Sequence, residues 1–279
     1  IHDQLSTADT FENATMAALS SGITTIGDFA TQQKGESLTD CYLKRKKEAE
    51  KSQIPVYLHL GITDWRKDSF DQISDLQKNY GLHSIKLFTT YKDRGYDSHS
   101  GQILRALEMS RKMGYVVMVH CEEDDLITSF REKIEEDKNL DTLCKFRMIR
   151  PPIVEAAAID RLCFLNQHAK GNLYIVHIST AEGIEILSEY RRKNPESRYY
   201  AETCPQYLFL DEHVFNQSDG YLYTCCPQIK SLADQQGLRK NICSKNFQTI
   251  ATDHCPFLPE EKKQGYDAGY SFIPPGLPG

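Results

Sequence analysis

The sequence predicts an α/β fold built around a parallel β-sheet. Seven short apolar runs, rich in β-branched or aromatic residues, recur along the 279-residue chain, and such near-continuous apolarity is typical of strands covered on both faces. Amphipathic stretches with helical spacing lie between the runs. This alternation closes either as an open doubly wound sheet or as a (β/α)8 barrel, for which the sequence supplies one strand too few.

The individual elements follow from the local pattern. Strands are predicted at residues 23–29, 55–62, 84–90, 116–122, 173–179, 198–204 and 249–253. Helices are predicted at residues 10–22, 104–114, 151–171 and 181–193; glycine ends several of them, and proline or a Ser/Thr cap begins two. No glycine-rich phosphate-binding loop follows a strand, which disfavours nucleotide binding. No linker divides the chain, so residues 1–279 are predicted to form one domain.

Composition narrows the classes of partner. The formal net charge is -6 and the charges are scattered, so no basic surface is offered to nucleic acid or to an anionic membrane. No apolar run is long enough to span a bilayer, and the first 20 residues lack a signal-peptide pattern. The nine cysteines have no regular spacing and no CxxC motif, which favours reduced thiols. These features predict a cytoplasmic location and exclude nucleic acid and membranes as partners.

Polar side chains fall where the chemistry of a barrel is expected, in or at the carboxyl ends of strands. They are Lys86, His120, His177 and Asp253. Any one of them alone is better explained as a hydrogen-bonded core residue or a helix cap. Together, two imidazoles and a carboxylate are the ligands of a zinc-like divalent metal, and a buried lysine can become neutral enough to form an anionic carbamate with carbon dioxide.

A family resemblance rests on six segments that occur in order along the chain. They are "SIKLFTTYK", "VVMVHCEEDDL", "NLYIVHISTAEG", "AETCPQYL", "TIATDHCPF" and "IPPGLPG". These segments resemble the amidohydrolase superfamily, and most closely its dihydropyrimidinase (hydantoinase) branch, with dihydroorotases and allantoinases as near relatives. The resemblance runs from about Asp9 to Gly279. It implies a TIM-like (β/α)8 barrel, hydrolysis of a cyclic amide in a dihydropyrimidine or hydantoin ring, and assembly into a homotetramer or a dimer.

The resemblance also implies roles for individual residues. Lys86, carboxylated, would bridge two Zn²⁺ ions, His120 and His177 would complete one metal site, and Asp253 would bind the other metal. A metal-bridged hydroxide would attack the ring carbonyl, while Asp253 takes its proton and passes it to the leaving nitrogen. Tyr91, five residues after the lysine, would stabilise the oxyanion.

Substrate contacts are implied in two further segments. In "CCPQIK", Cys226 stands where the family has serine and Lys230 where it usually has arginine; in "IPPGLPG", Pro275 stands where asparagine is common. Contacts made by backbone carbonyls would survive these changes, although the proline has no amide to donate. His59, Glu122 and His254 are interpreted as structural residues or supports of the metal ligands.

Some expected segments are not found in the sequence. The His-x-His pair of the family's first strand would precede Ile1, with His2 as a less favoured second member, and the last barrel helix and a small β-sandwich would follow Gly279. The chain is therefore predicted to be an incomplete barrel that binds one zinc ion or none. Dihydroorotase or allantoinase activity, a non-catalytic scaffold related to the dihydropyrimidinases, and a metal-free doubly wound binding protein are the alternatives.

Overall fold

Seven parallel strands form one curved sheet in the structure, a computed structural model that describes residues 7–278. The strands are β1 (Ile26–Thr31), β2 (Val56–Gly61), β3 (Ser84–Phe88), β4 (Val116–His120), β5 (Asn172–Ile175), β6 (Arg198–Thr203) and β7 (Thr249–Ile250). They pair in sequence order, each parallel to the next. A doubly wound sheet reverses its strand order at a switch point. The sequential order therefore decides between the two predicted closures in favour of the barrel.

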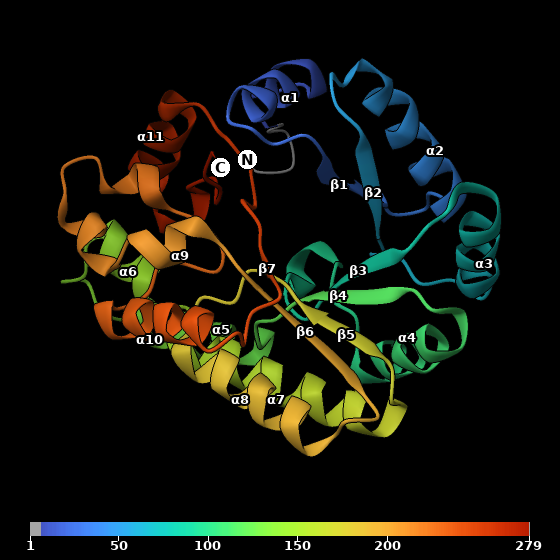
Figure 1. Cartoon of the computed structure of the whole chain (residues 1–279). Helices are drawn as coiled ribbons and strands as arrows, with labels where there is room; N and C mark the ends of the chain where they lie inside the picture. The colour runs from blue at the N-terminus through green and yellow to red at the C-terminus, as the bar shows by residue number, and fades with distance from the viewer. Residues whose placement is uncertain (1–6, 279) are drawn as a thin grey trace.

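Helices cover the outer side of this sheet (Figure 1). The longer ones are α1 (Phe11–Ser20), α2 (Leu38–Glu48), α3 (Ser69–Tyr80), α4 (Ser100–Met113), α5 (Asp124–Glu135), α7 (Pro152–Ala169), α8 (Ala181–Lys193), α10 (Leu232–Cys243) and α11 (Pro259–Ala268). The shorter ones are α6 (Thr142–Met148) and α9 (Pro205–Phe209), with 3-10 turns such as η3 (Lys92–Arg94) and η5 (Gly220–Tyr223). Within residues 7–278 no ladder joins β1 to β7, and they form the two edges of the sheet.

Alternation along each strand separates a core from an inner face. Leu58 and Leu60 of β2 and Ile85 and Leu87 of β3 belong to the main apolar cluster, which also contains helix residues such as Ile103 of α4. The intervening positions include His59, Lys86 and Tyr174. Each of these side chains contacts a residue of another strand, on the concave face of the sheet. Apolar side chains thus fix the register, and the polar set is left on the inner face.

The predicted elements are confirmed, with two informative differences at strand ends. The runs predicted at 173–179 and 249–253 stop pairing at Ile175 and Ile250. His177 and Asp253 follow with φ of 41° and 51°. A left-handed residue cannot continue an extended ladder, so both side chains lie in turns beyond the strands rather than closing them.

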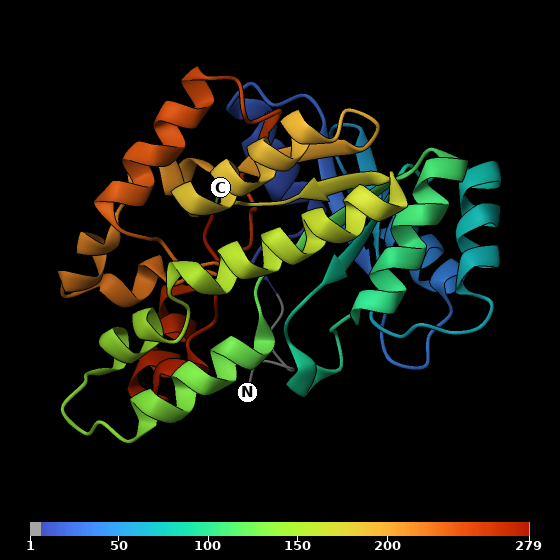
Figure 2. The same cartoon turned by 90° about the horizontal axis from the view of Figure 1, so that it is seen from below.

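The helices that come next after β4 and β7 gather on one side of the molecule. Figure 2 shows α5, α6 and α11 together on the side away from α3 and α4. These helices follow β4 and β7 in the sequence, so they lie beyond the strand ends that carry His120 and Asp253. Cap residues fix where other helices begin. His99 and Gln102 form a capping box at the start of α4, and Pro152 is the first residue of α7.

Candidate metal and catalytic site

Two buried imidazoles face each other at neighbouring strand ends. His120 is the last residue of β4, and His177 lies two residues beyond β5. His120 Nδ1 is 3.0 Å from His177 Nε2, and the ring centroids are 4.7 Å apart in an edge-to-face arrangement. Burial lowers the pKa of both histidines, so both rings are neutral and present lone pairs, the form in which imidazole binds a metal.

His177 is held in its turn by the backbone. Its N–H donates to Glu202 Oε1 over 3.2 Å, and its positive φ turns the ring toward His120. Its other ring nitrogen, Nδ1, is buried with no hydrogen-bond partner among residues 7–278. A buried orphan nitrogen is unusual, and a ring with so few protein partners suits a ligand that the protein itself does not supply.

Lys86 occupies the middle of β3 in an apolar setting. Its Nζ lies 5.5 Å from the ring centroid of Phe29 and 5.4 Å from that of Phe88, and the residue is 5% exposed. Burial lowers the pKa of Lys86 to about 8, against the opposing attraction of Asp253 and Glu202. A fraction of the amine is therefore neutral near pH 7.5, which is the form that reacts with carbon dioxide.

Asp253 lies on the same concave face beyond β7. Solvent reaches this residue, yet the protein around it raises the pKa of its carboxyl, while Lys86 and His120 act to lower it. No ion pair joins Asp253 to Lys86 within 4 Å in the described chain. The structure thus brings the two imidazoles into contact and leaves the carboxylate and the lysine facing the same space at longer range.

The donors fit a metal ion in their chemistry, although the protein ligands do not form a closed cage. Across residues 7–278, no three His, Cys, Asp or Glu side chains cluster closely enough to hold a cation. The imidazole pair supplies two neutral nitrogen donors, and a carbamate on Lys86 would add the anionic oxygen that the unmodified amine lacks. The predicted metal ligands therefore stay a prediction with a partial geometric basis.

Tyr91 lies over the imidazole pair in the loop after β3. Its φ is 67°, and its ring centroid is 5.3 Å from that of His120. Burial raises the pKa of Tyr91 well above its usual value, so the phenol keeps its proton and can donate a hydrogen bond. This position suits the predicted oxyanion role.

The two predicted substrate segments lie side by side. Gly276 N donates to Thr224 O over 3.0 Å, which ties the loop containing Pro275 to the stretch that leads into Cys226. Cys255 N donates to Leu277 O over 2.8 Å, which ties the same loop to the turn after Asp253. Burial raises the pKa of the Cys226 thiol, and Tyr91 lies near enough to act in the opposite direction. Sequence segments far apart therefore converge near the imidazoles.

The remaining polar residues named from the sequence have other partners. His59 Nδ1 contacts Ser84 Oγ over 2.6 Å, and His254 Nε2 contacts Asp9 Oδ2 over 2.8 Å. Glu122 is fully buried between His120 and Arg150. Lys230 points inward, with Nζ 2.7 Å from Arg150 O. His2 lies outside the described residues. Sequence reasoning missed Arg150, because an arginine before two prolines resembles an exposed helix cap.

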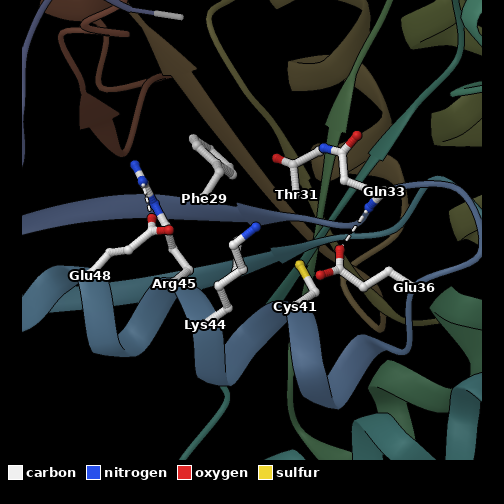
Figure 3. Close-up of a pocket in the computed structure, with 9 residues that line it drawn as sticks. Phe29, Thr31, Gln33, Glu36, Cys41, Lys44, Arg45 and Glu48 are labelled. Carbon is white, nitrogen blue, oxygen red and sulfur yellow. Dashed lines mark hydrogen bonds and ion pairs between the residues drawn. The ribbon is translucent and has the colours of Figure 1, made fainter.

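A pocket elsewhere does not belong to this site. Its volume is about 210 Å³, and it lies against β1 and α2, lined by charged residues that include Lys44, Arg45 and Glu48 (Figure 3). Arg45 donates to Glu48 over 2.8 Å. No predicted site residue lines this pocket. None of the helices described is long and apolar enough to cross a membrane. All nine cysteines are free thiols.

Known proteins share both the sequence and the fold. The chain is 32% identical over 275 residues to a D-hydantoinase of Geobacillus stearothermophilus and 33% identical over 279 residues to one of Streptomyces coelicolor; each match covers 98% of the chain and 58% of the relative. The solved structure of a D-hydantoinase from Bacillus sp. AR9 superposes with a TM-score of 0.92 at 30% identity over 99% of this chain and 60% of that one. No family model matches the chain.

The curved sheet of seven parallel strands in sequential order, with helices around it, is the TIM-barrel-like fold of these structures. The chain belongs to the hydantoinase branch of the amidohydrolase superfamily. It spans about three fifths of the length of the relatives that it matches.

Proposed function

We propose that this chain carries the catalytic centre of a zinc-dependent hydrolase that opens a cyclic amide, with a dihydropyrimidine or hydantoin ring as substrate. The observation that carries the proposal is the buried imidazole pair, whose facing nitrogens are 3.0 Å apart. One nitrogen of the pair, His177 Nδ1, is buried with no partner among residues 7–278, which is costly unless a ligand supplies one. Similarity to proteins named D-hydantoinase and dihydropyrimidinase supports the ring as substrate.

His120, His177, Asp253 and carboxylated Lys86 would hold the metal. When bound, zinc supplies a hydroxide nucleophile near neutral pH and polarises the substrate carbonyl. Asp253 is solvent-accessible and its pKa is raised, so its carboxylate can accept a proton and return it to the leaving ring nitrogen. Tyr91 donates its phenolic hydrogen to the developing oxyanion.

The substrate ring would be held mainly by backbone groups. Residues 224–226 and 274–277 are joined by the bond from Gly276 N to Thr224 O, and their remaining carbonyls can accept from ring N–H groups. Such contacts explain why Cys226 and Pro275 can replace the usual residues. The proposal includes a homo-oligomer of two or four chains. It also includes a cytoplasmic location, which the free cysteines support.

Turnover by the zinc-loaded chain tests the proposal. The chain is supplied with zinc and bicarbonate and assayed against dihydrouracil, hydantoin, dihydroorotate and allantoin, so that the ring is identified in the same experiment. We expect His120→Asn to remove activity, because one of two imidazole donors is lost. His168→Asn is the matched control, since His168 is exposed on α7, and it should leave turnover unchanged.

Two outcomes would contradict the proposal. Turnover that survives both His120→Asn and Lys86→Ala would place the chemistry elsewhere. Absence of turnover on all four rings, in a chain shown by metal analysis to hold zinc, would instead favour the non-catalytic scaffold.

A further inference from the structure

Four charged side chains are buried near the imidazole pair, and one of them, Glu122, contacts it directly. They are Glu122, Arg150, Glu155 and Lys230, each 8% exposed or less. Glu122 lies in the turn after β4, Arg150 between α6 and α7, Glu155 on α7 and Lys230 in the segment before α10. Burying charges is costly unless they are paired and hydrogen-bonded. These four, which we call the buried quartet, carry two charges of each sign.

The Glu122 carboxylate determines which nitrogen of His120 carries hydrogen. Its Oε2 is 2.7 Å from His120 Nε2 and also accepts from the Arg150 guanidinium. Because this carboxylate is paired with the buried Arg150 guanidinium, it is an ionised group that only accepts hydrogen bonds. His120 must therefore donate from Nε2, which leaves the Nδ1 lone pair directed at His177.

The Glu155 carboxylate holds the turn that carries His177. Its Oε1 accepts from Ser179 N and from Ser179 Oγ, each over 2.9 Å. Its Oε2 accepts from Thr180 Oγ1. Thr180 is also the N-cap of α8 and accepts from Gly183 N over 3.1 Å. One carboxylate thus ties the two residues that follow Ile178 to α7, and the position of His177 follows from that of its turn.

Lys230 connects the two halves of the buried quartet. Its Nζ donates to Arg150 O over 2.7 Å and to Gln228 Oε1 over 3.1 Å. Its charge acts to lower the pKa of both Glu155 and Glu122. Arg150 also lies 5.7 Å from the ring centroid of Tyr91, so the same group of charges reaches the proposed oxyanion donor.

We propose that the buried quartet is a positioning layer for the imidazole pair, in which Glu122 sets the tautomer of His120 and Glu155 sets the turn of His177. The metal that the pair would then bind rests on the proposed function, whereas the tautomer and the turn do not. None of the four residues touches the reacting atoms, so they are positioning residues. Partners of this kind typically alter metal affinity by about 10- to 100-fold when removed.

Nitrogen-15 NMR of the chain labelled at histidine tests the layer without metal or substrate. The chain has nine histidines, and His120 and His177 are assigned by their Asn variants. We expect His120 to show one tautomer, protonated at Nε2. Glu122→Gln should give a mixture, because an amide can either donate or accept. Glu155→Gln should leave the tautomer of His120 unchanged but shift the signals of His177.

Zinc affinity is measured in parallel by competition with a chromophoric chelator. We expect the zinc dissociation constant to rise about 10- to 100-fold in Glu122→Gln and about tenfold in Glu155→Gln. Glu123→Gln is the matched control, because its carboxylate is adjacent in sequence but pairs with Arg161 over 2.6 Å; it should change neither readout. If Glu122→Gln does not fold, the double variant Glu122→Gln/Arg150→Met is used in its place, because it removes both buried charges and leaves neither unpaired.

The proposal is overturned if Glu122→Gln, or its double variant, keeps a single Nε2–H tautomer and binds zinc within twofold of the parent. Unchanged His177 signals and zinc affinity in Glu155→Gln would overturn the second half. A chain that shows the expected tautomer but no turnover on any ring would contradict the proposed function alone.

Discussion

Replacing Lys86 by methionine should stabilise the metal-free chain at neutral pH. The pKa of Lys86 falls from 10.5 to about 8 because of burial, and Nζ makes no hydrogen bond within residues 7–278. Between these two pKa values the unfolded chain binds a proton that the folded chain has released, so stability rises with pH. The wild-type chain has its full stability above pH 10.5 and loses it as the pH falls through 8. The difference between the two pKa values corresponds to about 3 kcal/mol.

Lys86→Met removes this loss, because methionine fits an apolar site of similar size and does not titrate. We expect the variant to be more stable by up to about 3 kcal/mol at pH 7, with the advantage shrinking as the pH rises from 8 to 10. The assay is urea unfolding followed by circular dichroism, in buffers free of metal and carbon dioxide, at several pH values. Lys240→Met, at an exposed position of α10, should stay within about 0.5 kcal/mol of the parent throughout.

Two results would refute this reasoning. A variant less stable than the parent at pH 7 would mean that Lys86 is held by contacts that outweigh its desolvation. A stability difference that does not change with pH would mean that the amine titrates normally, and the proposed reaction with carbon dioxide would lose its physical basis.

Three further predictions concern other residues. Lys262 is also buried, and burial lowers its pKa to about 8, but its Nζ donates to Leu222 O and Thr224 O over 2.9 and 2.8 Å. Lys262→Met should therefore lower the free energy of unfolding in urea by about 2 kcal/mol, because it leaves buried carbonyl acceptors without a donor. A variant more stable than the parent would contradict this. Gly171→Ala should cost at least about 1–3 kcal/mol, since the added methyl would overlap the Leu107 carbonyl; an unchanged melting temperature would show that the backbone yields there. Tyr91→Phe should lower kcat about 10²- to 10³-fold with little change in KM if the phenol acts only on the oxyanion, and a rise in KM alone would make it a substrate-binding group.

The sequence predicts the sheet well because register and burial depend on alternation. In "SIKLF" the apolar residues Ile85 and Leu87 point into the core, so Lys86 must lie on the other face. His120 and His177 could be expected to meet, because β4 and β5 are consecutive parallel strands with Val119 opposite Ile175. Proximity of strand ends is a topological property, and topology follows from the order of the elements.

The orientation of each ring could not be predicted in the same way. It depends on Glu122 and Arg150, and on Glu155 through Ser179. Glu155 lies on α7, where a glutamate in the first turn is normally explained by the helix dipole. A single sequence does not distinguish such a residue from one that reaches a neighbouring element. These contacts to the imidazoles and their turns depend on how α7 packs against β5, which the sequence pattern does not specify.

Backbone strain at the site follows a consistent pattern. Five non-glycine residues among residues 7–278 have positive φ, and three of them are Tyr91, His177 and Asp253. Each lies two or three residues beyond the end of a strand, and such conformations cost about 1 kcal/mol or more. A strand that continued extended would carry its next side chain up or down the sheet, whereas a left-handed residue turns the chain and aims the side chain across the concave face. Before Tyr91 and His177 the strands are anchored by buried residues such as Leu87 and Ile175, which offsets this cost. The predicted strands are too long for the same reason, because His177 and Asp253 have left-handed backbone that cannot continue a strand.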